Sequence, residues 1–265
     1  MENLLIVKIG GNVIDQGEAL ASFLDDFAHL ATKKILVHGG GKLATEVSHA
    51  LGIEAIMVEG RRITDQETLK VVTMVYGGWI NKTLVSGLQA RGCNALGLTG
   101  ADADVVVAKK RQHPDIDFGF VGDIDRVNGA AIVHFLQAGL TPVFAPLTHD
   151  GQGTMLNTNA DTIAAALARA MLPYFRTTLI YCFDKKGVLA AADEDAVIAN
   201  LTFAQYQELR KKGVISKGMI PKLDESFAAL AAGAEAIVLC HASQLRLVVH
   251  GDESVGTRLS VKTFN

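Results

Sequence analysis

Short runs rich in β-branched residues alternate along this chain with longer segments in which apolar residues recur every three or four positions. The first run, LLIVKIG, precedes a helical pattern over residues 18–31, and a second run, KKILVHG, precedes another over residues 42–51. Such alternation is typical of a mainly parallel sheet covered by helices. We therefore expect an α/β protein.

The later elements follow the same plan. A long helical pattern covers residues 65–91, and Thr64 with Glu67 three residues later predicts a capping box at its start. The stretch DFGFVGDIDRVNG alternates like a hairpin at a sheet edge, and EAIVL is expected to close the sheet. Further helices are predicted over residues 159–171, 202–212 and 219–232. Because no proline-rich linker or shift in composition marks a boundary, we expect two lobes in one sheet that divide near Leu140.

Composition narrows the class of protein. Of the 265 residues, 49% are hydrophobic and 20% are charged, which allows a sizeable core, and a net charge of −3 disfavours nucleic acid and anionic membranes as partners. Cys93, Cys182 and Cys240 are scattered in apolar runs, so we expect buried free thiols in a reducing compartment. The chain enters a strand within three residues, and no apolar run approaches the ~20 residues that cross a bilayer. We expect a cytoplasmic protein without a signal peptide.

Two glycine-rich turns follow the first two strands. Lys8 cannot lie in a core without a partner, and the adjacent Gly10 and Gly11 add no packing, so we expect an anion, most simply a phosphate, where this strand meets its loop. The three glycines of VHGGGK form either an anion-binding nest of backbone N–H groups or only a tight turn. Neither the spacing GxxxxGK[ST] nor GxGxxG is present. His38, just before these glycines, is expected to be packed and hydrogen-bonded rather than catalytic.

Further polar motifs lie at strand ends or helix starts, where open α/β sheets bind ligands. Arg61 and Arg62 in EGRRIT suit bidentate capture of a carboxylate, or else belong to a solvated loop. Asn157, Asn159 and Asp161 alternate in MLNTNAD and would face one way, unless Asn159 or Asp161 only caps the next helix.

Near the C-terminus, ISKGMIPK places Lys217 and Lys222 around a glycine. Such lysines are ordinarily at the surface, and their relevance depends on Lys8 and Asp161 needing a partner. Taken in order, the motifs KIGG, VHGGGK, GRRIT, NKTLV, GLTGADAD, NTNAD and KGMIPK resemble the amino acid kinase family. The resemblance covers essentially the whole chain and ends at GTRL, which resembles the family's closing strand.

This resemblance implies an open αβα three-layer sandwich with a mainly parallel central sheet, in one domain over residues 1–265. A lobe of about residues 1–140 would bind the acyl amino acid, and one of about 141–265 would bind ATP with Mg²⁺, the metal carried by the nucleotide and not by protein ligands. The implied reaction phosphorylates the γ-carboxylate of N-acetyl-L-glutamate, or a related N-acylglutamate, in the second step of arginine biosynthesis. A glutamate side chain with an unperturbed pKa of ~4.3 is already an ionised nucleophile near neutral pH, so no general base is required.

The family's functional residues carry over by position. Lys8 and Lys222 match two lysines that hold the transferring phosphoryl group, and Asp161 matches the acidic residue that orients them. The glycines that contact phosphoryl and substrate correspond to Gly10, Gly11, Gly40 and Gly41. Arg62 and Asn157 match the residues that bind the α-carboxylate and neighbouring groups. The implied nucleotide contacts are Asp184, Gly187, Val188, Leu189, Val214, Ile215 and Ser216.

Three departures from the family pattern bear on the substrates. The nucleotide loop reads DKKG, and Lys217 replaces an acidic residue. The extra lysines Lys185, Lys186 and Lys217 would reach ATP phosphates or be solvated. Trp79 is bulky where a small residue is expected, and would fill part of the acyl pocket or lie in a subunit contact. N-succinylglutamate therefore stays open as the acceptor, because its extra carboxylate needs only room and another cation.

We expect a homodimer built on the helix that starts at Asp65. Because the first strand starts at Leu4, we do not expect the additional N-terminal helix that links arginine-inhibited members of the family into hexamers. Glutamate 5-kinase, carbamate kinase and uridylate kinase are alternatives within the family that the motifs fit less well. Aspartokinase is a further alternative, but it usually carries an appended regulatory domain, for which we expect no residues here. A non-catalytic amino-acid sensor on the same fold is the remote alternative. Such a protein would have lost Lys8, Asp161 or Lys222, and all three are present in this sequence.

Overall fold

A computed structural model describes residues 1–40, 42–58, 61–190, 196–215 and 218–261. Its central sheet has the strand order β12-β14-β13-β11-β1-β2-β8-β5. Neighbouring strands run parallel except for β13 and β14, which are antiparallel. These strands are β1 (Asn3–Ile9), β2 (Lys33–His38), β5 (Ala95–Leu98), β8 (Thr141–Phe144), β11 (Arg176–Phe183), β12 (Asn200–Thr202), β13 (Ala236–His241) and β14 (Thr257–Ser260). The predicted α/β class with a mainly parallel sheet is confirmed.

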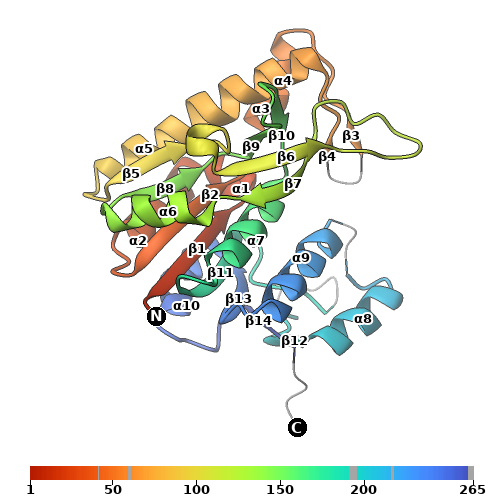
Figure 1. Cartoon of the computed structure of the whole chain (residues 1–265). Helices are drawn as coiled ribbons and strands as arrows, with labels where there is room; N and C mark the ends of the chain where they lie inside the picture. The colour runs from red at the N-terminus through yellow and green to blue at the C-terminus, as the bar shows by residue number, and fades with distance from the viewer. Residues whose placement is uncertain (41, 59–60, 191–195, 216–217, 262–265) are drawn as a thin grey trace.

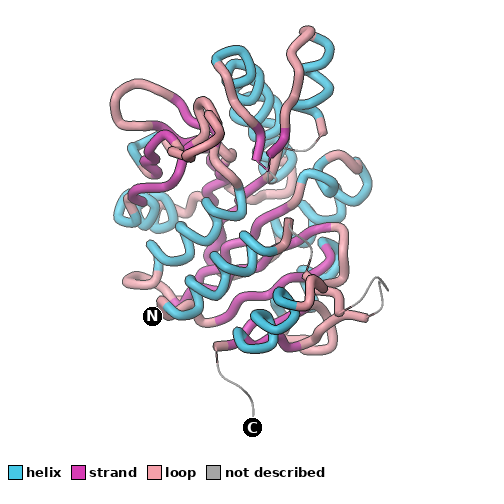
Figure 2. The backbone as a smooth tube through the Cα atoms, turned by 90° about the vertical axis from the view of Figure 1, so that its right-hand side faces the viewer, coloured by secondary structure: helices cyan, strands magenta, loops and turns pink. Residues whose placement is uncertain are grey.

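Helices cover both faces of this sheet and complete three layers (Figure 1). One face packs against α6 (Gly129–Gln137), α7 (Ala160–Met171) and α9 (Ile220–Ala231), and the other against α2 (Gly17–Ala28), α5 (Asn81–Gln89) and α10 (Leu245–Val249). The apolar stripes of these helices form two separate cores, as Ile163 of α7 and Phe27 of α2 illustrate. Figure 2 shows the strands running between the helices. The predicted αβα sandwich is confirmed.

Two strands extend the sheet beyond EAIVL, which forms β13. β14 pairs with β13, and β12 lies at the edge, so the expectation that EAIVL closes the sheet is wrong. The reason is that the C-terminal segment folds back as β14 and pairs antiparallel with β13, while β12, which precedes β13 in the chain, pairs parallel with the outer side of β14. The division near Leu140 stays a prediction; β8, which follows it, pairs with β2 and β5.

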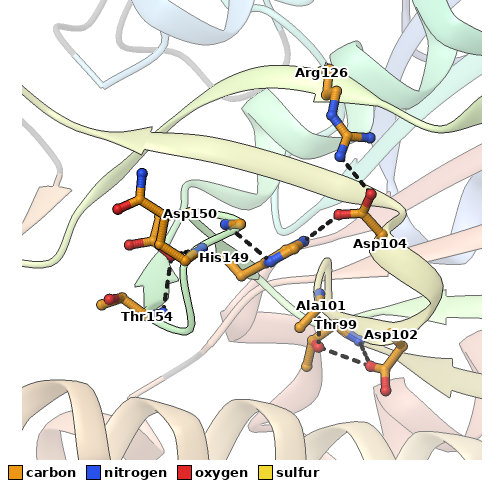
Figure 3. A network of polar contacts seen from close by, with 10 residues as sticks. Thr99, Ala101, Asp102, Asp104, Arg126, His149, Asp150 and Thr154 are labelled. Atoms are coloured by element: carbon orange, nitrogen blue, oxygen red, sulfur yellow. Dashed lines mark hydrogen bonds and ion pairs between the residues drawn. The ribbon is translucent and has the colours of Figure 1, made fainter.

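A smaller sheet stands above the carboxyl ends of the central strands, with the order β10-β9-β6-β7. It comprises β6 (Val106–Lys110), β7 (Gly122–Val127), β9 (Leu147–His149) and β10 (Met155–Asn157). The stretch predicted as an edge hairpin supplies only β7, which pairs antiparallel with β6 at the edge. Asp104 ties this sheet together, because it pairs with Arg126 of β7 and, at 3.0 Å, with Nε2 of His149 of β9 (Figure 3).

The long helix predicted over residues 65–91 is confirmed as three continuous segments: α4 (Gln66–Val72), a π-helical stretch (Thr73–Ile80) and α5. The capping box is wrong. Asp65, not Thr64, is the N-cap and accepts from the Thr68 N–H at 2.8 Å, because the Thr64 hydroxyl instead donates to the Arg62 carbonyl. The π-helical stretch adds residues to each turn and redirects the side chains that follow α4.

The remaining elements are short connections and surface helices. They are α1 (Gly11–Ile14), α3 (Leu43–Ala50), β3 (Met57–Val58), β4 (Arg61–Arg62), a 3₁₀ turn (Asp102–Asp104), α8 (Phe203–Lys211) and a second 3₁₀ turn (Ala242–Gln244). All three cysteines are buried free thiols, as predicted. Among the described residues, no helix is long and apolar enough to span a membrane.

Candidate active site

The two glycine-rich turns lie side by side because β1 and β2 are parallel neighbours that end at the same edge. The Gly39 N–H donates to the Ile9 carbonyl at 3.0 Å, and a Cβ on Gly39 would lie 3.3 Å from the Gly11 nitrogen. Gly10 in turn donates to the Cys182 carbonyl of β11 at 3.0 Å. The turns therefore form one surface of backbone at the sheet edge. Gly41 lies outside the described residues.

Lys8 and Lys222 share one carboxylate. Lys8 Nζ lies 2.7 Å from Oδ1 of Asp161, and Lys222 Nζ lies 3.6 Å from Oδ2 of the same side chain. Their side chains are only 10%, 11% and 20% exposed, in the order Lys8, Lys222 and Asp161. Lys8 comes from β1, Asp161 from the first turn of α7 and Lys222 from α9, so three segments distant in sequence meet here.

Asn159 is the N-cap of α7, and its Oδ1 accepts from the N–H groups of Asp161 and Thr162. Of the two interpretations of NTNAD, the cap therefore applies to Asn159, while Asp161 is free to face the lysines. The cap fixes the first turn of the helix, and Asp161 projects from that turn.

Burial and the charged neighbours shift the pKa values of Asp161 and Lys222. Burial raises the pKa of Asp161, but Lys8 and Lys222 outweigh burial, so the pKa lies below its ordinary value. Burial lowers the pKa of Lys222, and Lys8 lowers it further, while Asp161 opposes both effects. The Asp161 carboxylate thus favours the charged form of Lys222.

A cavity of about 270 Å³ opens beside this cluster. Its lining combines Lys8 and Asp161 with the glycine turns, two arginines and the start of α7: Lys8, Gly11, Gly39, Gly40, Met57, Arg61, Arg62, Tyr76, Val121, Pro146, Asn157, Thr158, Asn159, Ala160 and Asp161. Arg62 is buried, and its Nη2 donates to Thr45 Oγ1 at 2.8 Å, whereas its Nη1 has no hydrogen-bond partner among the described residues. Asn157 Nδ2 donates to Thr64 Oγ1 at 3.0 Å.

The residues expected to contact the nucleotide do not line this cavity, among those that the structure describes. Asp184 follows β11 and accepts from Asn12 at 2.8 Å, which joins the loop after β11 to the first glycine turn. The Val188 N–H donates to Thr257 Oγ1 at 2.8 Å, and Val188 and Ile215 are core residues rather than cavity residues. Gly187 is buried, Leu189 and Lys185 are half-buried, and Val214 and Lys186 are exposed. Ser216 and Lys217 lie outside the described residues.

His38 is fully buried and packed, as predicted. Its Nδ1 lies 2.9 Å from the Gly39 carbonyl, and the Asn81 side-chain amide lies 3.2 Å from its Nε2. Burial lowers the pKa of His38 to about 4, with the hydrogen bond to Gly39 opposing and Lys8 adding to the effect. The ring is therefore neutral and supports the second glycine turn.

Sequence reasoning missed Tyr76 and Thr64. Tyr76 lies in the π-helical stretch, lines the cavity and covers Gly40 so closely that a Cβ there would be 2.1 Å from the ring. Trp79, one turn later, is 68% exposed and does not line this cavity; with Leu43 and Thr83 it lines a separate one. The π-helical phase could not be read from a 3.6-residue period, and Thr64 resembled an ordinary cap.

The arrangement can hold two anions at once. Two ammonium groups and a net positive charge suit a phosphoryl group. The buried guanidinium of Arg62 suits a carboxylate in the same cavity. No covalent nucleophile is needed for chemistry that brings these two anions together.

Comparisons with a family model and with relatives of known name all indicate the same family. The model of the amino acid kinase family matches residues 3–241. Acetylglutamate kinase of Cytophaga hutchinsonii is 57% identical over 261 residues, which are 98% of this chain and 99% of that protein. Acetylglutamate kinase of Bacteroides thetaiotaomicron is 51% identical over 259 residues, 97% of this chain and 98% of the relative.

Solved structures share the fold. A protein of Streptococcus mutans superposes with a TM-score of 0.80 at 28% identity, over 98% of this chain and 99% of its own. Carbamate kinase of Giardia lamblia, bound to AMP-PNP, superposes with a TM-score of 0.69 at 12% identity, over 98% of both chains. At that identity the second likeness concerns the fold alone.

Proposed function

The chain belongs to the amino acid kinase family, and we propose that it transfers the γ-phosphoryl group of ATP to the γ-carboxylate of N-acetyl-L-glutamate, the second step of arginine biosynthesis. One observation carries the proposal: Lys8 and Lys222 share Asp161 at a cavity that Arg62 also lines. The full-length identity to acetylglutamate kinases, at 51–57%, supports this acceptor.

Each residue has a part in bringing two anions together. Arg62, whose Nη1 has no hydrogen-bond partner within the described part of the chain, is proposed to bind the α-carboxylate, and the γ-carboxylate then faces the lysines. Lys8 and Lys222 are proposed to hold the phosphoryl group from two sides as charge spreads over its oxygens. Asp161 favours the charged form of Lys222 and takes no proton from the acceptor, which is already ionised. The N–H groups of Gly11 and Gly40 are proposed to complete the phosphate site, because those of Gly10 and Gly39 already donate to the Cys182 and Ile9 carbonyls.

MgATP is the proposed second substrate, with Mg²⁺ carried by the nucleotide to offset phosphate charge. The proposed nucleotide contacts are the residues after β11, from Asp184 to Leu189, and the segment of Val214, Ile215 and Ser216. The link from Asn12 to Asp184 supports this assignment, because it joins the loop after β11 to the phosphate-binding turn. The proposed lobes, near residues 1–140 and 141–265, divide the two substrates accordingly.

One observation favours keeping N-succinyl-L-glutamate as a second acceptor. Arg61 lines the cavity beside Arg62, so a second cation is present within reach of an extra carboxylate. The decisive assay is ATP-dependent acyl phosphate formation, trapped as the hydroxamate, with N-acetylglutamate, N-succinylglutamate and free glutamate in parallel.

Activity with an acylated substrate and none with free glutamate supports the proposal and names the acyl group. Activity with free glutamate alone would assign the chain to glutamate 5-kinase instead. Lys8→Met should abolish activity with every acceptor. Lys33→Met is the matched control, since Lys33 also lies in a strand of the sheet but pairs with Glu2 at the surface.

The proposed assembly is a homodimer on the long helix, in the cytoplasm. Met74 and Trp79 on the π-helical stretch are 57% and 68% exposed, which is unusual for large apolar side chains and suits a contact with a second copy. The three buried free thiols suit a reducing compartment.

A further inference from the structure

Thr64 is completely buried between two segments of the candidate site. Its N–H donates to the Phe118 carbonyl at 3.0 Å, and its carbonyl accepts from the Phe120 N–H at 2.6 Å. The Phe120 carbonyl then accepts from the Asn157 N–H at 2.8 Å. Thr64 and Asn157, 93 residues apart, are thus both held by backbone hydrogen bonds to the segment of residues 118–120.

The backbone around Thr64 leaves little freedom. Gly119 lies between the two phenylalanines with φ +68°, and a Cβ there would lie 2.1 Å from the Thr64 carbonyl oxygen. Only a glycine allows this approach without displacing the Thr64 backbone. The hydroxyl of Thr64 is therefore presented at a fixed position.

The direction of the hydrogen bonds at this hydroxyl follows from its partners. A threonine hydroxyl has one proton, and the Arg62 carbonyl, 2.8 Å away, can only accept. The hydroxyl donates its proton to that carbonyl, so only its lone pairs are available to Asn157. The Asn157 group 3.0 Å away must then be the NH₂ end of the amide, and Oδ1 is the end that is left for the cavity, which Asn157 lines.

We propose that Thr64 is a positioning residue that fixes the Asn157 amide with Oδ1 as a hydrogen-bond acceptor for the N–H of the acylated amino group of the substrate. The inference rests on the proposed function, because only an N-acyl amino acid carries a secondary amide N–H next to the α-carboxylate that Arg62 is proposed to bind. Thr64 touches no substrate in this scheme and acts through Asn157.

The experiment compares the N-acyl acceptor identified above with its ester analogue, in which oxygen replaces the amide N–H (2-acetyloxyglutarate for N-acetylglutamate). The ester has no proton for Asn157 Oδ1 and sets a lone pair against it. We expect the wild-type kcat/KM to be about tenfold or more lower for the ester, the usual effect of a missing partner for a buried polar atom.

Thr64→Val removes the hydroxyl and frees the Asn157 amide to rotate, so the ratio of kcat/KM values for amide and ester should fall toward one. Thr64→Ser keeps the hydroxyl and should keep the ratio. Thr177→Val is the matched control. Thr177 is also fully buried, and its hydroxyl also donates to the carbonyl two residues earlier, that of Phe175. Thr177 lies at the amino end of β11, whereas the candidate site lies at the carboxyl ends of the strands. Its ratio should equal that of the wild type.

The ratio separates this inference from a structural role, because a loss of folded protein lowers both activities equally. A wild-type enzyme that uses amide and ester equally well, or a Thr64→Val variant that keeps the wild-type ratio, would overturn the inference. If Thr64→Val does not fold, Thr64→Ala removes the same two bonds, and the wild-type comparison still decides. Absence of activity on every N-acyl acceptor would instead refute the proposed function.

Discussion

Replacing Asp161 by Asn tests whether the shared carboxylate holds the site together. At distances of 2.7 and 3.6 Å and an effective dielectric constant of ~20, its attractions to Lys8 and Lys222 amount to about 6 and about 5 kcal/mol. The cost of burying the three charges offsets most of this. Breaking a buried ion pair by removing one partner typically costs about 3–5 kcal/mol, because the remaining charge is left without compensation. We expect Asp161→Asn to lower the unfolding free energy by that amount at pH 7.

The pH dependence gives a second readout. The pKa of Asp161 is lowered in the folded state, so its contribution to stability is present above its unfolded pKa of 3.8 and is lost as the pH falls through the folded value. Asp161→Asn should lack this loss in acid. The pKa of Lys222, already lowered by burial and by Lys8, should fall further, so any residual activity should decline at a lower pH than in the wild type as the pH is raised.

Urea unfolding at pH 7 and at a series of lower pH values measures both effects. Asp25→Asn is the matched control, because Asp25 pairs with Arg91 at 2.6 Å but its side chain is 57% exposed, and such surface pairs contribute about 1 kcal/mol or less. If Asp161→Asn destabilised the protein no more than Asp25→Asn does, the view of Asp161 as the charge that compensates both lysines would be refuted.

Three further predictions concern the surroundings of this cluster. Gly40→Ala should raise the KM for the acceptor about tenfold or more without changing that for ATP, because its Cβ would fall 2.1 Å from the Tyr76 ring; Tyr76→Ala in the same chain should restore much of the loss, and no restoration would contradict the contact. His38 has a pKa of about 4 in the folded state against 6.5 in the unfolded state, so the wild type should lose about 3 kcal/mol of stability relative to His38→Gln as the pH falls from 6.5 to 4. If the unfolding free energies of the two proteins changed equally with pH, burial of a neutral His38 ring would be refuted. Trp79→Lys should convert the proposed homodimer to monomers in sedimentation, whereas an unchanged mass would exclude this stretch of the long helix as the contact.

Part of the site follows from local rules. Lys8 and the glycine turns could be predicted because parallel strands end at one edge and a lysine beside glycines needs an anion there. Asp161 could be suspected but not separated from a helix cap, since Asn159 and Asp161 have the same local signature and only the tertiary structure shows that Asn159 is the cap. Lys222 had no local signal, and only the resemblance to a family placed it with Lys8.

The wrong capping box at Thr64 and the unpredicted role of Tyr76 have a common physical cause, which is that tertiary contacts override local sequence preferences. Thr64 looked like the start of a capping box, but Arg62 and Asn157 engage its hydroxyl, and Asp65 caps the helix in its place. Tyr76 reaches the cavity because the helix takes π-helical turns, and a continuous apolar pattern contains no mark of that change.

The number of charges in the cluster is itself constrained. With two lysines and one carboxylate the cluster carries a net charge of +1, which attracts a phosphoryl group. Without Asp161, burial and repulsion by Lys8 would lower the pKa of Lys222 further and disfavour the charge that holds the transferring group. A second carboxylate at the same depth would cancel the net charge and repel both substrates. The position of β1 brings these three charges together. Because β1 pairs with β2 on one side and β11 on the other, Lys8 lies at the centre of the sheet, next to Asp161 of α7, which also pairs with Lys222 of α9.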